Sequence, residues 1–135
     1  MSARPTVVLD ASLGVKWFKP EAGSASAIEL LGRAASGEFA LAAPTHFAHE
    51  VLSVVRRYYS AADVMPAWRL IAASGVSIIP LTPEVIAEAA HQCEVLDCSF
   101  YDALAPACAV LLGATLASAD ARAHAGFPGV LLIDS

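Results

Sequence analysis

The stretch Val7-Val8-Leu9-Asp10 places three consecutive apolar side chains directly before a carboxylate. Apolar residues without polar alternation are typical of a strand that is buried on both faces, as in a parallel sheet. Ligands of open parallel sheets bind beyond the carboxyl ends of the strands, and Asp10 lies at such an end. The alternative is that Asp10 serves only as a turn or helix-capping residue, positions that aspartate favours.

Strand-like and helical segments alternate along the rest of the chain. Short apolar runs predict further strands over residues 39–42, 76–81, 115–117 and 130–133. Apolar spacing and end signals predict helices over residues 13–18, 24–35, 44–58, 62–74, 82–96, 99–113 and 121–125. This alternation predicts an α/β fold with a parallel sheet of about five strands and helices on both faces. No linker or repeat interrupts it, so residues 1–135 are expected to form a single domain.

The composition is that of a compact chain of low charge. Of its 135 residues, 57% are hydrophobic and only 16% are charged. General disorder is thereby excluded, because disordered chains are poor in hydrophobic residues. The 13 acidic and 8 basic side chains give a net charge of −5. This balance excludes proteins that hold nucleic acid over a broad basic surface.

The cysteines and apolar runs indicate the compartment. The three cysteines form no C-x-x-C pair, so neither a disulfide framework nor a zinc ribbon is expected. The N-terminal residues do not resemble a signal peptide. No apolar run approaches the ~20 residues that cross a bilayer. We therefore expect a cytoplasmic protein with reduced thiols and no membrane association.

Four carboxylates are expected to converge beyond the carboxyl ends of the strands. Asp10 closes the first strand and Asp120 follows the fourth. Glu50 lies beside the apolar stripe of its helix, and Asp102 lies in the first turn of the helix that Ser99 begins. Each has a structural alternative, either as an exposed glutamate or as an aspartate at a helix start. It is the combination of all four that indicates a site.

A divalent cation would relieve the repulsion among these four carboxylates. In a half-buried site of low dielectric that repulsion amounts to several kcal/mol. Ligands that are all oxygen, without cysteine or histidine, select Mg²⁺ or Mn²⁺ rather than Zn²⁺. One or two such ions can polarise a phosphodiester and activate a water for in-line attack. The residues thus predict metal-dependent hydrolysis of phosphodiester bonds.

The sequence does not match the patterns of two other classes of site. His46-Phe-Ala-His49-Glu50 is not the zinc-protease H-E-x-x-H pattern, because its second histidine precedes the glutamate. A receiver domain needs a lysine late in the chain, whereas the only lysines here are Lys16 and Lys19. We interpret His46 and His49 as surface or core residues, with a supporting role at the site as the alternative.

Four short motifs follow one another across nearly the whole chain. They are Val7-Val-Leu-Asp10-Ala-Ser-Leu-Gly-Val-Lys-Trp-Phe18, Pro44-Thr-His-Phe-Ala-His-Glu50-Val-Leu-Ser-Val-Val, Ser99-Phe-Tyr-Asp102-Ala-Leu-Ala and Leu116-Ala-Ser118-Ala-Asp120-Ala-Arg. In this order they resemble the motifs of PIN-domain ribonucleases, in particular the VapC-like toxins of prokaryotic toxin–antitoxin pairs. Each motif is weak alone, whereas four in order with compatible length are specific.

The resemblance implies a PIN-like three-layer fold with a five-stranded parallel sheet. It also implies endonucleolytic cleavage of RNA. It places Asp10, Glu50, Asp102 and Asp120 in a Mg²⁺ or Mn²⁺ site. Ser118 is implied as a hydroxyl neighbour, and Ser12 is a weaker candidate of the same type. The resemblance further implies a homodimer and a cognate antitoxin protein, for which the helices within residues 13–35 and 62–74 are the candidate groove.

Several assignments stay open. Pro106 departs from the family pattern: early in its helix it would do little harm, whereas further in it would produce a kink, and either case affects the direction of Asp102. Asp97 either joins the acidic rim or is a solvated charge. Five basic residues have two interpretations: they contact RNA around the cleft, or they form an ordinary solvated surface. They are Lys16, Lys19, Arg56, Arg57 and Arg69.

Two other functions compete with a toxin ribonuclease. One is a nuclease of the same fold that acts in RNA processing or on structured DNA. The other is a PIN-like module that binds RNA or protein without cutting. The complete acidic set favours a nuclease over this last alternative, because a site without catalysis has no reason to keep four repelling charges.

Overall fold

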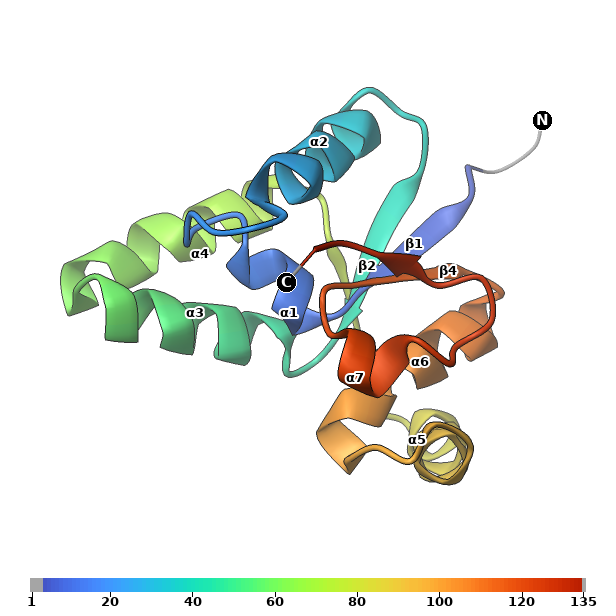
Figure 1. Ribbon diagram of the computed structural model, residues 1–135. Helices are drawn as coiled ribbons and strands as arrows, with labels where there is room; N and C mark the ends of the chain where they lie inside the picture. The colour runs from blue at the N-terminus through green and yellow to red at the C-terminus, as the bar shows by residue number, and fades with distance from the viewer. Residues whose placement is uncertain (1–3, 135) are drawn as a thin grey trace.

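A five-stranded parallel sheet forms the centre of the molecule. The computed structural model describes residues 4–134. The strands follow the order β3-β2-β1-β4-β5, and every neighbouring pair is parallel. Their bounds are β1 Thr6–Leu9, β2 Ala40–Pro44, β3 Ser77–Ile79, β4 Thr115–Ser118 and β5 Leu131–Leu132. β1 lies in the middle (Figure 1), so the stretch that ends at Asp10 is the central strand of the sheet.

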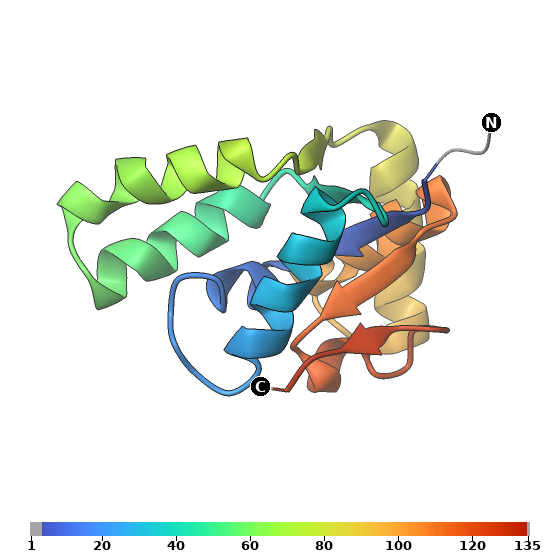
Figure 2. The same cartoon turned by 90° about the horizontal axis from the view of Figure 1, so that it is seen from above.

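Helices cover both faces of the sheet, as expected. In chain order they are α1 Ala11–Val15, α2 Ser24–Ala35, α3 Phe47–Tyr58, the 3₁₀ turn η1 Ala61–Asp63, α4 Val64–Ala73, α5 Pro83–Leu96, α6 Phe100–Leu112 and α7 Ala121–His124. Helices α1 to α4 pack on one face, and α5 and α6 pack on the other. The hairpin of α3 and α4 projects beyond the sheet (Figure 2).

The central strand explains this arrangement. Val7 and Leu9 belong to the core cluster that also contains Leu13, Leu30 and Phe47 of the first helical layer. Val8 points the other way, into the cluster formed with α5 and α6. Successive side chains of a strand point to opposite faces, so an uninterrupted apolar run is buried on both. The predicted three-layer α/β fold is confirmed.

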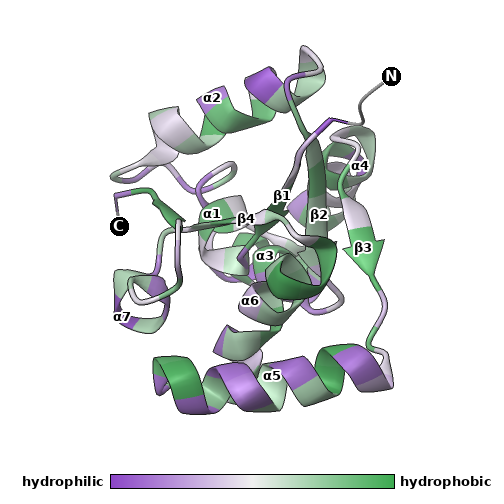
Figure 3. Ribbon diagram, turned by 90° about the vertical axis from the view of Figure 1, so that its right-hand side faces the viewer, coloured by the Kyte–Doolittle hydropathy of each residue, from purple (hydrophilic) through white to green (hydrophobic). Residues whose placement is uncertain are grey.

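Helix α6 is the inner helix of the second layer. It buries a run of small side chains, Ala103, Ala105, Ala107, Cys108 and Ala109. Helix α5 packs against it and carries both polar and apolar turns (Figure 3). Among the described residues no single helix is long and apolar enough to cross a membrane; α5 and α6 reach that length and composition only as a pair, and they are bent by 111°.

The expectation that Pro44 opens a helix is wrong. Pro44 is buried and is the last residue of β2, where it pairs with Ile79 of β3. The helix begins at Phe47, with His46 at the N-cap position. The φ angle that proline fixes is compatible with the end of a strand as well as with a helix start, and pairing with β3 decides between them.

Other boundaries differ by small amounts. Helices α2 and α5 span the expected residues, whereas α1 begins at Ala11, two residues before the expected start. Strands β3 and β5 are shorter than the apolar runs that predict them. Both lie at sheet edges with a neighbour on one side only, so part of each run has no partner strand to pair with.

Candidate active site

The carboxyl ends of β1 and β4 bring two of the four carboxylates to one edge of the sheet. Asp10 directly follows β1, and its backbone N–H donates to the carbonyl of Ala117 on β4 at 3.0 Å. Asp120 lies two residues beyond the end of β4. Because β1 and β4 are hydrogen-bonded neighbours, both aspartates lie at the same edge of the sheet, where ligands of parallel sheets bind.

Both aspartates also begin helices. Oδ2 of Asp10 accepts the N–H of Ser12 at 3.0 Å, which caps α1. Oδ1 of Asp120 accepts the N–H of Ala123 at 3.1 Å, which caps α7. The capping role and a role at the site are therefore compatible, because each cap uses only one of the two carboxylate oxygens.

A pocket beside Asp120 gathers two more acidic side chains. It is lined by Asp97, Cys98, Ser99, Asp102, Asp120, Arg122 and Ala123. Asp102 lies in the first turn of α6, where its N–H donates to Oγ of Ser99 at 3.1 Å. Asp97 ends α5 with a φ of 51°, so it has a structural role at this rim. The structure thus brings Asp102 and Asp120 into one pocket, with Asp97 beside them.

The thiol of Cys98 lies in this pocket, and its pKa is raised. Burial raises the pKa of Cys98 to about 11, and the charges of Asp97, Asp102 and Asp120 contribute to the increase. Burial likewise raises the pKa of Cys108 to about 11. A cysteine nucleophile reacts as the thiolate, so neither thiol is suited to nucleophilic catalysis at neutral pH.

The negative charges of two of the other candidate carboxylates affect the pKa of Glu50. Its pKa is raised, first by partial burial and then by the negative charges of Asp10 and Asp102. Burial lowers the pKa of the neighbouring His46, although the same two aspartates oppose this effect. His46 is therefore neutral at neutral pH, and the 3.7 Å approach of its Nε2 to Oε1 of Glu50 is not an ion pair there. The charges of Asp10 and Asp102 thus both act on the Glu50 carboxylate.

An open groove continues from Glu50 along α3. Its lining residues are His46, His49, Glu50, Ser53, Val54, Arg57 and Tyr101. The rings of His46 and Tyr101 lie 5.6 Å apart at one end. Nδ1 of His46 is buried and has no hydrogen-bond partner within residues 4–134. The groove combines a cationic side chain with aromatic and imidazole rings next to the carboxylates.

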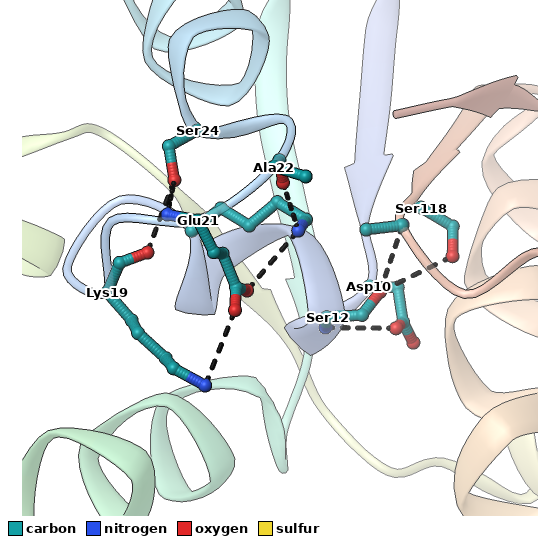
Figure 4. Close-up of polar contacts among 9 residues, drawn as sticks. Asp10, Ser12, Lys19, Glu21, Ala22, Ser24 and Ser118 are labelled. Carbon is teal, nitrogen blue, oxygen red and sulfur yellow. Dashed lines mark hydrogen bonds and ion pairs between the residues drawn. The ribbon is translucent and has the colours of Figure 1, made fainter. Parts of the chain in front are cut away.

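Two serine hydroxyls connect the strand ends. Oγ of Ser12 accepts the N–H of Ala119 at 3.0 Å and lies 3.4 Å from Oγ of Ser118 (Figure 4). Oγ of the fully buried Ser118 accepts the N–H of Asp120 at 3.0 Å. The hydroxyls therefore hold the loops that carry Asp10 and Asp120 in fixed positions relative to each other.

Sequence reasoning missed His124. Its side chain is fully buried, Nδ1 lies 2.6 Å from Oγ of Ser118, and Nε2 lies 2.6 Å from the carbonyl oxygen of Asp102. The available signal was Pro106, which removes an N–H four residues after Asp102. Pro106 is the seventh residue of α6, too far in for the harmless early position, yet the helix continues to Leu112.

The donor chemistry of the site fits a hard divalent cation. The four candidate carboxylates offer only oxygen, and the charges of Asp10 and Asp102 add to the effect of burial in raising the pKa of Glu50. Within residues 4–134 no group of three or more Asp, Glu, His or Cys side chains is close enough to form a complete ligand set. Mg²⁺ retains several water ligands in proteins, so a small number of carboxylates is sufficient to bind it.

The five basic residues are placed differently from one another. Lys16 is buried, and its Nζ donates to Glu21 at 3.2 Å and to the carbonyl of Ala22 (Figure 4 shows this loop), so its charge stabilises the fold instead of facing solvent. Lys19 also pairs with Glu21, at 3.4 Å, and lies over the ring of Tyr58. Only Arg57 lines the groove beside Glu50, and two further arginines are exposed outside it, Arg56 and Arg69.

In a comparison with protein families, the model of the PIN domain matches residues 7–126. The chain belongs to the PIN domain family. This match confirms the resemblance drawn from the four motifs, all of which lie inside the matched residues. None of the curated proteins matches the chain in sequence.

Several solved structures share its fold. A toxin–antitoxin complex from Klebsiella pneumoniae is 19% identical with a TM-score of 0.69, and the alignment covers 96% of each chain. A sarcin–ricin loop cleaving toxin of Mycobacterium tuberculosis is 18% identical with a TM-score of 0.71, over 92% of this chain and 98% of the other. A VapBC complex from Rickettsia felis bound to promoter DNA is 15% identical with a TM-score of 0.69, over 96% and 98%. At these identities the likeness establishes the fold alone.

Proposed function

We propose that this PIN domain protein is a metal-dependent endoribonuclease and the toxin of a toxin–antitoxin pair. The observation that carries the proposal is the placement of Asp10 and Asp120 at the carboxyl edge of the sheet, with Asp102 in the pocket beside Asp120. Partial burial raises the pKa of Glu50, the charges of Asp10 and Asp102 raise it further, and Asp102 shares a pocket with Asp120. Perturbed carboxylates are typical of functional sites, and a cation-dependent site accounts for the acidic side chains gathered here.

Asp10, Glu50, Asp102 and Asp120 would hold Mg²⁺ or Mn²⁺. When bound, the metal lowers the pKa of a coordinated water and stabilises negative charge on the phosphate. Ser12 and Ser118 fix the loops that carry Asp10 and Asp120, so the direction of both carboxylates is set before substrate binds. Hydrolysis then proceeds without a covalent intermediate on the protein, because no activated thiol or other nucleophile is needed.

The groove along α3 suits a single strand of RNA. Arg57 can neutralise a phosphate, and the exposed ring of Tyr101 can stack on a base, which are the two contacts typical of single-strand binding. The Mycobacterium tuberculosis toxin of the same fold is described as cleaving the sarcin–ricin loop. This description supports RNA as the substrate class, without identifying the target of this protein.

An antitoxin would lie between α2 and α4. An apolar groove of about 680 Å³ there is lined by Trp17, Phe18, Ile28, Leu31, Ala35, Leu70, Ala73 and Ser74. These residues belong to the two segments expected to form the antitoxin groove. Leu70 is 63% exposed, which is unfavourable unless a partner covers it. An antitoxin segment that ends in arginine would also bind the carboxylates, because guanidinium pairs with them in a bidentate manner.

Cleavage assays on purified protein test the proposal. We expect cuts within single-stranded regions of RNA in Mg²⁺ or Mn²⁺, none in EDTA, and growth arrest on expression that Asp10→Asn abolishes. We also expect a homodimer by light scattering. Cleavage without growth arrest would favour a PIN nuclease of RNA processing, and RNA binding without cleavage would favour a non-catalytic module.

A further inference from the structure

Pro106 removes one hydrogen bond from the helix that carries Asp102. In an α-helix the N–H of residue 106 would donate to the carbonyl of residue 102, but proline has no N–H. Pro106 is the seventh residue of α6, and its side chain is fully buried. The Asp102 carbonyl therefore lacks the α-helical donor that an N–H at residue 106 would provide, and a donor from outside α6 can replace it.

His124 provides that donor. Its Nε2 lies 2.6 Å from the carbonyl oxygen of Asp102. A carbonyl oxygen only accepts, so Nε2 carries a proton, and in the tautomer that has its one proton there Nδ1 is the acceptor. Nδ1 lies 2.6 Å from Oγ of Ser118, and in this tautomer the Ser118 hydroxyl is the donor in that bond.

The hydrogen bonds form one directed chain. Ser118 uses its proton on His124, so its oxygen is free to accept from the N–H of Asp120 and from the hydroxyl of Ser12. The Ser12 oxygen already accepts the N–H of Ala119, which leaves its own proton for Ser118. The chain runs from the first turn of α1, through the end of β4 and through α7, to the first turn of α6.

We propose that His124 is a positioning residue of the carboxylate site, replacing the hydrogen bond that Pro106 removes and so fixing the first turn of α6. Both backbone polar groups of Asp102 are then held by side chains, its N–H by Ser99 and its carbonyl by His124. The Asp102 carboxylate, which makes neither of these bonds, is directed toward the pocket that it shares with Asp120. The part of this inference that concerns metal rests on the proposed function.

A double-mutant cycle with Mn²⁺ alone as the probe tests the pairing. His124→Leu is expected to weaken Mn²⁺ binding, measured by calorimetry, by about 10–100-fold, the range typical of residues that orient metal ligands. In a Pro106→Ala background the new alanine supplies the missing N–H, so the same change is expected to weaken binding less than about threefold. His124→Gln, which keeps one donor and one acceptor, is expected to retain most of the wild-type affinity. His91→Leu, an exposed histidine of α5, is the control.

Equal losses in the two backgrounds would overturn the proposal, since they would show that His124 and Pro106 act independently. If His124→Leu alone does not fold, the Pro106→Ala/His124→Leu double variant is expected to fold; failure of that variant as well would overturn it. Long-range ¹H–¹⁵N spectra of the metal-free protein are expected to show His124 neutral with its proton on Nε2, and a proton on Nδ1 would contradict the chain of donors.

Cleavage of RNA separates this inference from the proposed function. Wild-type protein that binds Mn²⁺ and shows the expected coupling, but cuts no RNA, would overturn the ribonuclease proposal and leave His124 as a positioning residue. Wild-type protein that cuts RNA while the cycle is additive would overturn the role of His124 alone. Wild-type protein that binds no Mn²⁺ would overturn both.

Discussion

The hydroxyl oxygens of Ser12 and Ser118 lie 3.4 Å apart, although 106 positions separate the two residues in the chain. The pairing of β1 with β4 produces this contact, because each serine lies close to the carboxyl end of its strand. Asp10 and Asp120 are each two residues away from one of these serines. Asp10 and Asp120 are therefore held by the central strand of the sheet and one of its two neighbours.

The carboxylates are expected to be individually necessary for RNA cleavage. Asp10→Asn, Glu50→Gln and Asp102→Asn should each reduce the rate at least ~100-fold, since each removes a charged ligand that positions the metal. The rate is measured with a labelled RNA in Mn²⁺. Glu94→Gln, which changes an exposed carboxylate of α5, is the matched control and should retain full activity. Full activity in any of the three variants would remove that residue from the site.

Much of this architecture follows from local sequence patterns. The run Val7–Leu9 predicts a strand buried on both faces, and the Thr82-Pro83 pair predicts the start of α5. The order of strands and helices then leads to a parallel sheet, which places Asp10 and Asp120 at one edge. Local patterns are sufficient here because each of these residues has its role within its own strand or helix start.

Residues whose role depends on distant partners could not be predicted in this way. Lysines usually lie at the surface, but Glu21 and the Ala22 carbonyl bind the ammonium group of Lys16 inside a loop. His124 has a role only because Pro106, on another helix, leaves a carbonyl without a donor. Pro44 ends a strand because β3 pairs with it. In each case the deciding partner is close in space and not in sequence.

The free energy of unfolding is expected to respond to the charge of Glu50. The pKa of Glu50 is raised in the folded protein, so the folded state holds this proton more tightly than the unfolded state does. The destabilising effect is absent below the ordinary glutamate pKa of about 4.3 and develops fully as the pH rises through the folded pKa. Glu50→Gln should therefore raise the Tm of metal-free protein at pH 7, and the gain should vanish near pH 4.

Thermal unfolding followed by circular dichroism across this pH range, in EDTA, checks the Glu50 prediction. Glu94→Gln again serves as the control, and its Tm should differ little from that of wild type at every pH. A Tm of Glu50→Gln that is lower than wild type at pH 7 would show that the Glu50 carboxylate stabilises the fold, against the repulsion inferred from Asp10 and Asp102.

Two glycines in helices should respond to alanine in opposite directions. A Cβ on Gly14 of α1 would lie 2.6 Å from Cζ of Phe47 and 2.9 Å from Cγ2 of Val51, both fully buried on α3. Gly14→Ala is thus expected to lower the free energy of unfolding by about 1–3 kcal/mol through overpacking. A Cβ on Gly32 of α2 meets nothing within 4 Å. Gly32→Ala should raise the free energy of unfolding by about 0.5–1 kcal/mol. Urea unfolding measures the effect of both substitutions.

Arg57 is expected to contribute to RNA binding through charge. It lines the groove beside Glu50, whereas Arg33 on α2 pairs with Glu38 at 2.8 Å, outside that groove. In an Asp10→Asn background, which prevents cleavage, Arg57→Gln should weaken RNA binding and reduce the slope of log Kd against log salt by about one. Arg33→Gln should change neither. Equal effects of the two substitutions in fluorescence anisotropy would show that the groove along α3 does not hold the RNA.

The groove between α2 and α4 is expected to bind the antitoxin independently of catalysis. Leu70 is 63% exposed in this groove, so Leu70→Glu adds a charge to the docking surface without disturbing the core. The matched control is Leu111→Glu, because Leu111 is 47% exposed at the far end of α6 and does not line the groove.

From the native host, wild type and Leu111→Glu should co-purify with the same small protein, and Leu70→Glu should not. Purified Leu70→Glu should still cut RNA at the wild-type rate, and expression of this variant should arrest growth even where the antitoxin is present. Retention of the small protein by Leu70→Glu would place the docking surface elsewhere on the chain.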